Sequence, residues 1–211
     1  MKIGIIGAGH IGSTLARHFV RIGHDVVISN SRGPESLAGL VEEIGGTLRA
    51  VTAEQAATFG QVVVVCIPYG RYTELPTDAL KDKVVIDTCN YYPERDGHDA
   101  ELDDDRTTSS EKIRAHTGAN LVKAFNAIHW ANLRDRGRPK GDPGRATIPI
   151  SGTDTEAKAV VAGLIRDIGF DPVDTGDIGR GGRTHQPGGR LYGAELTAEE
   201  MNDLLRAGAT I

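Results

Sequence analysis

Apolar residues in this chain gather in short, nearly continuous runs that are separated by longer mixed segments. The runs lie at residues 2–6, 25–29, 61–67, 84–87 and 120–124. A short apolar run without polar alternation is typical of a strand that is buried on both faces. Strands of this kind alternate along the chain with helices that cover both faces of a sheet. The pattern therefore predicts an α/β fold with a doubly wound, mostly parallel sheet.

Cap signals mark the expected starts of several helices. A Thr followed three residues later by Gln or Glu can form a capping box, in which each side chain bonds the backbone N–H of the other residue. Such pairs stand at Thr52 with Gln55, at Thr108 with Glu111 and at Thr153 with Glu156. A further helix is expected over 72–80 and a short strand over 47–51. The polar stretch from Tyr91 and the Gly- and Pro-containing stretch at 134–145 are predicted to be loops.

The first apolar run leads into Gly7-Ala8-Gly9-His10-Ile11-Gly12 at the start of a helix. Gly7 permits a tight turn, Gly9 leaves no side chain where phosphates must approach, and Gly12 allows the helix to pack close to the strand. The free N–H groups and the positive dipole at the helix start favour a pyrophosphate. In this context the motif predicts a Rossmann-type domain that binds a dinucleotide.

The end of the second strand distinguishes between two dinucleotides. A free ribose 2′-hydroxyl usually meets an Asp or Glu about twenty residues after the glycines. Here the strand ends in Ser29-Asn30-Ser31-Arg32 instead. Asn30 and Ser31 can hydrogen-bond a 2′-phosphate, and Arg32 can pair with it. These residues predict NADP(H) rather than NAD(H).

No internal repeat or linker divides the chain. We therefore expect an NADP-binding domain over residues 1–176 and a C-terminal tail with a helix over 177–211. The tail carries Leu191, Tyr192 and Leu196, which are too apolar to be left in water. It is expected to complete the cleft or to contact a second copy of the chain, so a homodimer is a hypothesis.

Composition adds several exclusions. The chain has 211 residues, of which 39% are hydrophobic, and a net charge of −5, so nothing in its electrostatics favours nucleic acid or a membrane as partner. No segment resembles a membrane span or a signal peptide, and Cys66 and Cys89 form no C-x-x-C pair. We therefore expect a cytoplasmic protein. No metal is expected, because the acidic run at 101–105 lacks His partners and EF-hand spacing.

Five segments together resemble the small NADP oxidoreductase family, which is typified by deazaflavin (coenzyme F-420)-dependent NADP reductases. They are residues 7–12, 30–32, 66–69, 122–126 and 150–154. The same N-terminal fold occurs in the cytoplasmic domains of metalloreductases. By this resemblance the cofactor contacts are Gly9, His10 and Ile11 in the phosphate-binding turn, Ser31 and Arg32, and further along the chain Ile67, Pro68, Tyr69 and Ala124. The resemblance implies hydride transfer between NADPH and a deazaflavin or flavin-like partner.

The acceptor decides whether a side chain must supply a proton. A flat flavin or deazaflavin ring needs only to be stacked on the nicotinamide at about 3 to 3.5 Å with water excluded. A small carbonyl or imine substrate needs a proton donor, and the candidates at the strand ends are Lys123, Asn126, His129 and Tyr69. His129 is the best of them because the unperturbed pKa of a histidine lies near the working pH. A non-catalytic NADPH-binding or sensing module is the third alternative.

Overall fold

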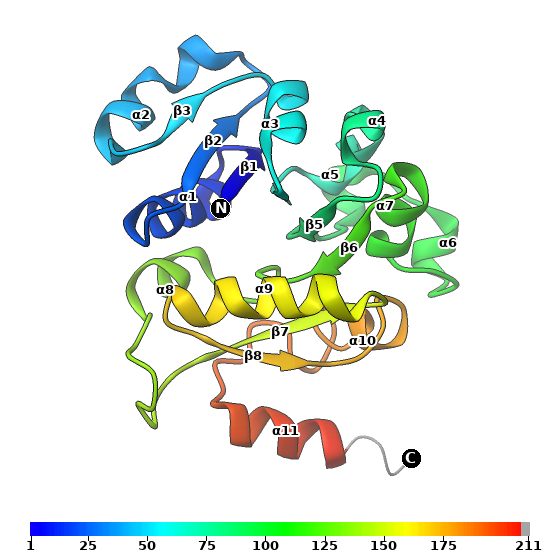
Figure 1. Cartoon of the computed structure of the whole chain (residues 1–211). Coiled ribbons are helices and arrows are strands. Elements are labelled where there is room, and N and C mark those ends of the chain that lie inside the picture. The colour runs from blue at the N-terminus through cyan, green and yellow to red at the C-terminus, as the bar shows by residue number, and fades with distance from the viewer. Residues whose placement is uncertain (208–211) are drawn as a thin grey trace.

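The structure, a computed structural model, describes residues 1–207 and contains one sheet of eight strands in the order β3-β2-β1-β4-β5-β6-β7-β8 (Figure 1). The strands are β1 (Lys2–Ile6), β2 (Asp25–Ser29), β3 (Arg49–Ala50), β4 (Val62–Val65), β5 (Val84–Asp87), β6 (Asn120–Lys123), β7 (Thr147–Gly152) and β8 (Asp171–Asp174). The first six strands pair in parallel, and β7 joins β6 antiparallel. The α/β, Rossmann-type, mostly parallel sheet is therefore confirmed.

Helices cover both faces of this sheet. The longer ones are α1 (His10–Arg21), α3 (Ala53–Phe59), α7 (Ser109–Thr117), α9 (Thr155–Asp167) and α11 (Ala198–Ala207). The shorter ones are η1 (Pro34–Leu37), α2 (Ala38–Ile44), η2 (Tyr69–Glu74), α4 (Thr77–Leu80), α5 (Pro93–Asp96), α6 (Ala100–Asp103), α8 (Trp130–Asp135) and α10 (Arg180–Arg183). Buried side chains of α1, α8 and α9 form one apolar cluster, and those of α3, α4 and α7 form another.

The four valines of β4 show why continuous apolar runs form the centre of the sheet. Val62 and Val64 belong to the first cluster, whereas Val63 and Val65 belong to the second. Successive side chains of a strand point to opposite faces, so a strand between two helical layers needs an apolar residue at every position. All four valines are buried, as the sequence predicted.

Some of the predicted elements are wrong in detail. The expected helix over 72–80 is split into η2 and α4, because Pro76 cannot donate a hydrogen bond inside a helix and restricts the residue before it. The strand expected over 47–51 shrinks to Arg49–Ala50. The helix cap expected from Thr153 is made by Asp154, whose carboxylate accepts a hydrogen bond from Ala157 N at 2.8 Å and lies favourably at the positive end of α9.

The other two capping boxes are present in full. Thr52 and Gln55 exchange side-chain and backbone hydrogen bonds at the start of α3. Thr108 and Glu111 do the same at the start of α7. Both helices thus begin where the sequence predicted.

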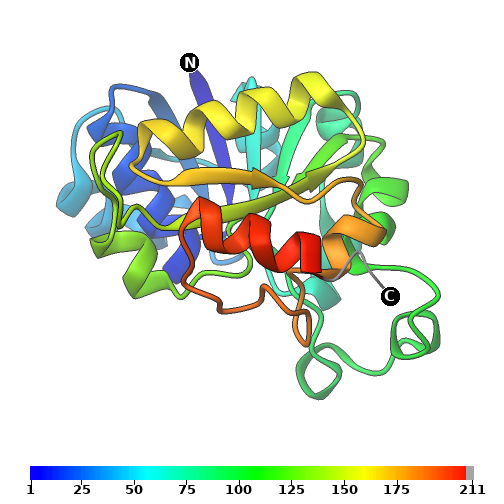
Figure 2. The same ribbon diagram turned by 90° about the horizontal axis from the view of Figure 1, so that it is seen from below.

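The C-terminal segment packs against the strands that end the sheet. Met201 on α11 joins Val173 and Leu191 in a small third cluster, and Figure 2 shows α11 alongside β8. The division at residue 176 stays a prediction. Within residues 1–207, no helix has the length and apolarity that crossing a membrane requires.

The two edges of the sheet are short or interrupted. At one edge β3 contains two residues. At the other edge β8 carries Pro172 beside Ile148 of β7.

Candidate active site

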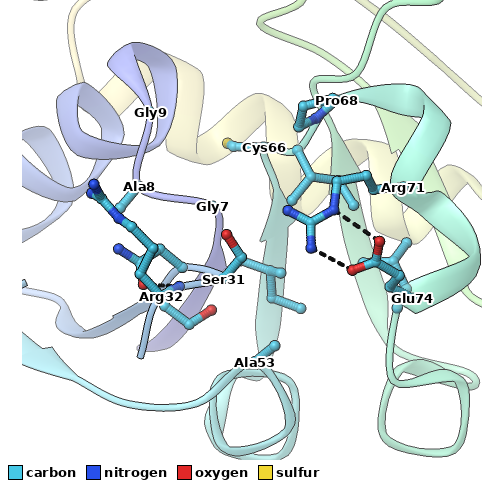
Figure 3. Close-up of a pocket in the computed structure, with 15 residues that line it drawn as sticks. Gly7, Ala8, Gly9, Ser31, Arg32, Ala53, Cys66, Pro68, Arg71 and Glu74 are labelled. Atoms are coloured by element: carbon cyan, nitrogen blue, oxygen red, sulfur yellow. Dashed lines mark hydrogen bonds and ion pairs between the residues drawn. The ribbon is translucent and has the colours of Figure 1, made fainter. Parts of the chain in front are cut away.

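A cavity of about 420 Å³ opens at the carboxyl ends of β1, β2 and β4 (Figure 3). In an open α/β sheet this edge is where ligands bind. The predicted cofactor residues that line the cavity are Gly7, Gly9, Asn30, Ser31, Arg32, Ile67 and Pro68. The structure thus brings together residues as far apart in the chain as Gly7 and Pro68.

Two of the turn glycines are required by the backbone itself. Gly7 has a φ of 109°, and a Cβ there would lie 2.2 Å from the carbonyl oxygen of Cys66. A Cβ on Gly12 would lie 1.9 Å from the carbonyl oxygen of Gly7. Gly12 therefore acts by letting α1 approach β1, and it does not line the cavity.

Gly9 differs from these two glycines because a Cβ there would meet no protein atom within 4 Å. Gly9 is the N-cap of α1, offers no side-chain cap, and is followed by no acidic residue in the first turn. The N–H groups that begin α1 are thus left for a ligand. An open position at such a helix start is the geometry that a pyrophosphate needs.

We expect Gly9→Ala to weaken dinucleotide binding without unfolding the protein. Its φ of −74° suits alanine, and no protein atom opposes the methyl group, but the methyl group occupies the space through which phosphates approach. The dissociation constants of NADPH and NADH should both rise at least about tenfold, or ~1.4 kcal/mol. Calorimetric titration measures binding, and a thermal melt measures stability.

Gly12→Ala is the matched control, because its methyl group would collide with backbone. That variant should lose stability first and binding as a result. Unchanged affinity in folded Gly9→Ala would contradict the assigned pyrophosphate position.

The loop after β2 presents Arg32 to the cavity. The Asn30 side chain holds this loop, because Oδ1 accepts hydrogen bonds from Arg32 N at 3.0 Å and from Ser36 Oγ at 3.2 Å. The side chains of Ser31 and Arg32 are exposed. Among residues 1–207, no acidic side chain forms an ion pair or a hydrogen bond with the Arg32 guanidinium. Its in-plane N–H groups are therefore available to an anion.

A second cavity, of about 350 Å³, begins at His10 and Ile11, directly after the residues that line the first. Its walls are rich in rings. The His10 and Trp130 rings are stacked with centroids 4.6 Å apart, and Phe125, His129 and Tyr192 also line the cavity. Phe125 has a φ of 61°, a left-handed conformation that is costly for a bulky residue and is common at functional sites.

His129 lies at this second cavity and begins α8. Its Nδ1 accepts a long hydrogen bond from Ala131 N at 3.4 Å, so Nε2 carries the proton in the neutral ring. The side chain is exposed. His129 can therefore offer a proton to a ligand in this cavity.

Lys123 is placed differently, inside the protein. Its side chain is 1% exposed, and Nζ contacts Asp87 Oδ2 at 3.3 Å, Cys89 O at 2.8 Å and Ser110 Oγ at 3.0 Å. Ser110 Oγ also donates to Asp87 Oδ2 at 2.6 Å. Lys123 lines neither cavity, and this buried cluster accounts for a lysine at the end of a central strand.

Tyr69 and Ala124 are also buried away from both cavities. Tyr69 packs against Tyr72 and Tyr91, and burial raises the pKa of its hydroxyl. Ala124 belongs to the first apolar cluster. Cys66 does line the first cavity, but burial raises the pKa of its thiol to about 12, so it is no ready nucleophile.

Asn126 connects the second cavity to the C-terminal segment. Its Nδ2 donates to Asn90 Oδ1 at 3.0 Å and to His185 O at 2.6 Å, and its Oδ1 accepts from His185 Nδ1 at 2.9 Å. His185 is fully buried, and Ser151 Oγ donates to its Nε2 at 3.0 Å. Burial and the nearby Lys123 charge lower the pKa of His185 to about 3, so the ring is neutral. Asn126 thus holds Asn90 at the cavity wall.

Known proteins share this fold. The profile of the family described as NADP oxidoreductase, coenzyme F420-dependent, matches residues 2–91. A hypothetical protein from Sinorhizobium meliloti is 32% identical, with a TM-score of 0.80 over 93% of this chain and 95% of its own. The chain belongs to the small NADP oxidoreductase family.

Two further relatives of this chain carry functional names. A structure from Arthrobacter sp. FB24, with the provisional name F420-dependent NADP reductase, is 26% identical and has a TM-score of 0.70 over 84% of this chain and 86% of its own. Metalloreductase STEAP3 of Rattus norvegicus is 30% identical over 181 residues. That match covers 84% of this chain, which spans about a third, 34%, of the length of STEAP3.

Sequence reasoning did not assign several residues that line the two cavities. The main ones are Glu74 in the first cavity and Asn90 and Trp130 in the second. Trp130 is the one that the sequence could have indicated, because it is the single tryptophan of the chain and lies soon after the family-like segment 122–126. Tyr192 comes from the C-terminal tail, and its hydroxyl group forms a hydrogen bond with the hydroxyl group of Tyr92.

Proposed function

We propose that this protein transfers a hydride between NADP(H) and a deazaflavin or flavin-like acceptor. The observation that carries the proposal is that two cavities follow one another along the turn from Gly7 to Ile11. Gly7, Ala8 and Gly9 line the first cavity, and His10 and Ile11 line the second. The first cavity offers open backbone N–H groups and the Arg32 guanidinium. The second offers stacked and neighbouring rings. A dinucleotide that enters the first would bring its nicotinamide to the second.

The residues present fit NADP(H). Gly9 leaves room for the pyrophosphate, and Ser31 and Arg32 offer a 2′-phosphate a hydroxyl and a guanidinium that has no acidic partner within residues 1–207. When bound, the dihydronicotinamide supplies the hydride. The protein's part is to orient the rings, which the strained Phe125 and the Asn126–Asn90 hydrogen bonds support by fixing the cavity wall.

A ring acceptor requires no side-chain acid at this site. The His10–Trp130 stack presents a flat aromatic boundary, and aromatic surfaces bind flat rings by offset stacking. The amide side chains of Asn90 and Asn126 also line this cavity, and they can orient a ring without transferring protons.

A reductase for a small carbonyl or imine compound is the second candidate. The exposed His129 favours it, because its Nε2 can donate a proton into the same cavity. This chemistry would place His129 in a catalytic role and Asn126 in a positioning role.

The test is loss of NADPH absorbance with a panel of acceptors, namely the deazaflavin coenzyme, free flavins, ferric chelates, small carbonyls and small imines. His129→Asn is the informative variant, since asparagine keeps a good helix cap but cannot act as the acid. Turnover of the deazaflavin or a flavin that survives in His129→Asn is the expected result. Turnover of carbonyls or imines that falls about 10²- to 10⁴-fold in the variant would favour the second candidate.

Two other outcomes count against both candidates. Tight NADPH binding with no oxidation by any acceptor would indicate a binding or sensing module. Failure to bind NADPH at all would remove the cofactor assignment.

His98→Asn is the matched control for His129→Asn, because His98 is exposed, pairs with Asp103 and lines neither cavity.

A further inference from the structure

The wall of the first cavity opposite Arg32 carries an ion pair. Arg71 Nε donates to Glu74 Oε1 at 2.8 Å, and Arg71 Nη2 donates to Glu74 Oε2 at 2.5 Å (Figure 3). Both residues belong to η2 and line the cavity. The pair raises the pKa of Arg71 and lowers that of Glu74, so each side chain keeps its charge. The guanidinium plane is thereby held in one orientation.

Arg71 and Arg32 therefore differ in how they can bind a ligand. Anions bind a guanidinium through its in-plane N–H groups. Arg32 has these groups free of acidic partners among the described residues, whereas Arg71 has two nitrogens committed to Glu74, whose charge offsets its own. A phosphate beside Arg71 would also meet the Glu74 carboxylate. The Arg71 side chain lines the cavity and is 45% exposed, so its plane can stack on a flat ring.

The surroundings of Arg71 suit a base better than a phosphate. Ala53, Pro68 and Leu75 line the same cavity, whose opposite walls carry Arg32 and Arg71, and they supply apolar surface there. If Arg32 holds the 2′-phosphate at the end of β2, the adenine attached to the same ribose lies between these walls.

We propose that Arg71, oriented by Glu74, is the stacking platform for the adenine ring of the dinucleotide. This inference rests on the cofactor part of the proposed function and not on the identity of the acceptor. It assigns the two cavity arginines to different parts of one ligand. Arg32 selects the 2′-phosphate, and Arg71 contributes to affinity for any adenine dinucleotide.

The test compares the binding of NADPH, NADH and reduced nicotinamide mononucleotide, which lacks the adenosine half, to Arg71→Leu by calorimetric titration. The dissociation constants of NADPH and NADH should rise by the same factor, about 3- to 30-fold. Affinity for the mononucleotide should not change. Arg71→Lys should show most of the loss, since lysine keeps the charge and lacks the plane.

Several outcomes would overturn the inference. A loss confined to NADPH would make Arg71 a phosphate ligand, and an unchanged affinity for both dinucleotides would give it no ligand role. Arg17→Leu is the matched control, because it breaks an ion pair with Glu43 that lies outside the cavity. Failure of the unaltered protein to bind either dinucleotide would count against the proposed function instead, so the two failures are distinguishable.

Discussion

Replacing Lys123 with methionine is expected to lower the free energy of unfolding by about 3 to 5 kcal/mol. The change removes the positive charge from a cluster in which Asp87 is fully buried, so the carboxylate is left without its counter-charge. A buried charge whose partner is removed costs this much because water cannot replace the partner. Urea unfolding, extrapolated to zero denaturant, measures the effect.

Two further variants make this prediction specific. Lys112→Met removes more exposed ion pairs with Asp99 and Glu101 and should cost about 1 kcal/mol or less. Lys123→Met combined with Asp87→Asn should recover part of the lost stability, because no buried charge is then left alone. Full stability of Lys123→Met with loss of turnover would instead restore the catalytic role that its place in the sequence suggested.

Arg32→Gln is expected to raise the dissociation constant of NADPH about 10- to 100-fold and to leave that of NADH nearly unchanged. Glutamine keeps a polar side chain but loses the charge and the forked donors that pair with a phosphate. A hydrogen bond to a charged group contributes about 1.5 to 3 kcal/mol, which corresponds to this range of affinity. Parallel titrations with the two nucleotides measure it.

Ser36→Ala is a useful companion to the Arg32 variant. Ser36 Oγ accepts a hydrogen bond from Asn30 Nδ2 at 2.9 Å and so helps to hold the loop that presents Arg32. Its loss should weaken NADPH binding less than the loss of Arg32 does. Equal weakening of NADPH and NADH in Arg32→Gln would contradict the 2′-phosphate assignment.

The sequence predicted the structure best where the signal lies within one short segment of the chain. The two complete capping boxes form between residues three positions apart, and the four valines of β4 are an uninterrupted apolar run that by itself identifies a strand buried on both faces. It failed at Thr153, where a neighbouring carboxylate competed for the same helix end. It also failed over 72–80, where the effect of Pro76 was underestimated.

The candidate site could be predicted only in part, because burial and distant partners are not local properties. Lys123 sits in a plausible catalytic position along the chain, but the partners that bury it come from β5 and α7. The bond between Asn126 and His185 joins segments 59 positions apart. The glycine turn and the strand end, by contrast, form the first cavity because β1 and β2 are adjacent in any sheet of this kind.

The short edges of the sheet restrict how copies of this chain can meet. An edge strand recruits another strand through its unpaired N–H and C=O groups, but β3 offers two residues and Pro172 removes a donor from β8. Strand-to-strand growth, the route by which many sheets aggregate, is thus disfavoured at both ends of the described sheet. A homodimer of this protein would have to form through its helices and loops, and its contacts would be made by side chains.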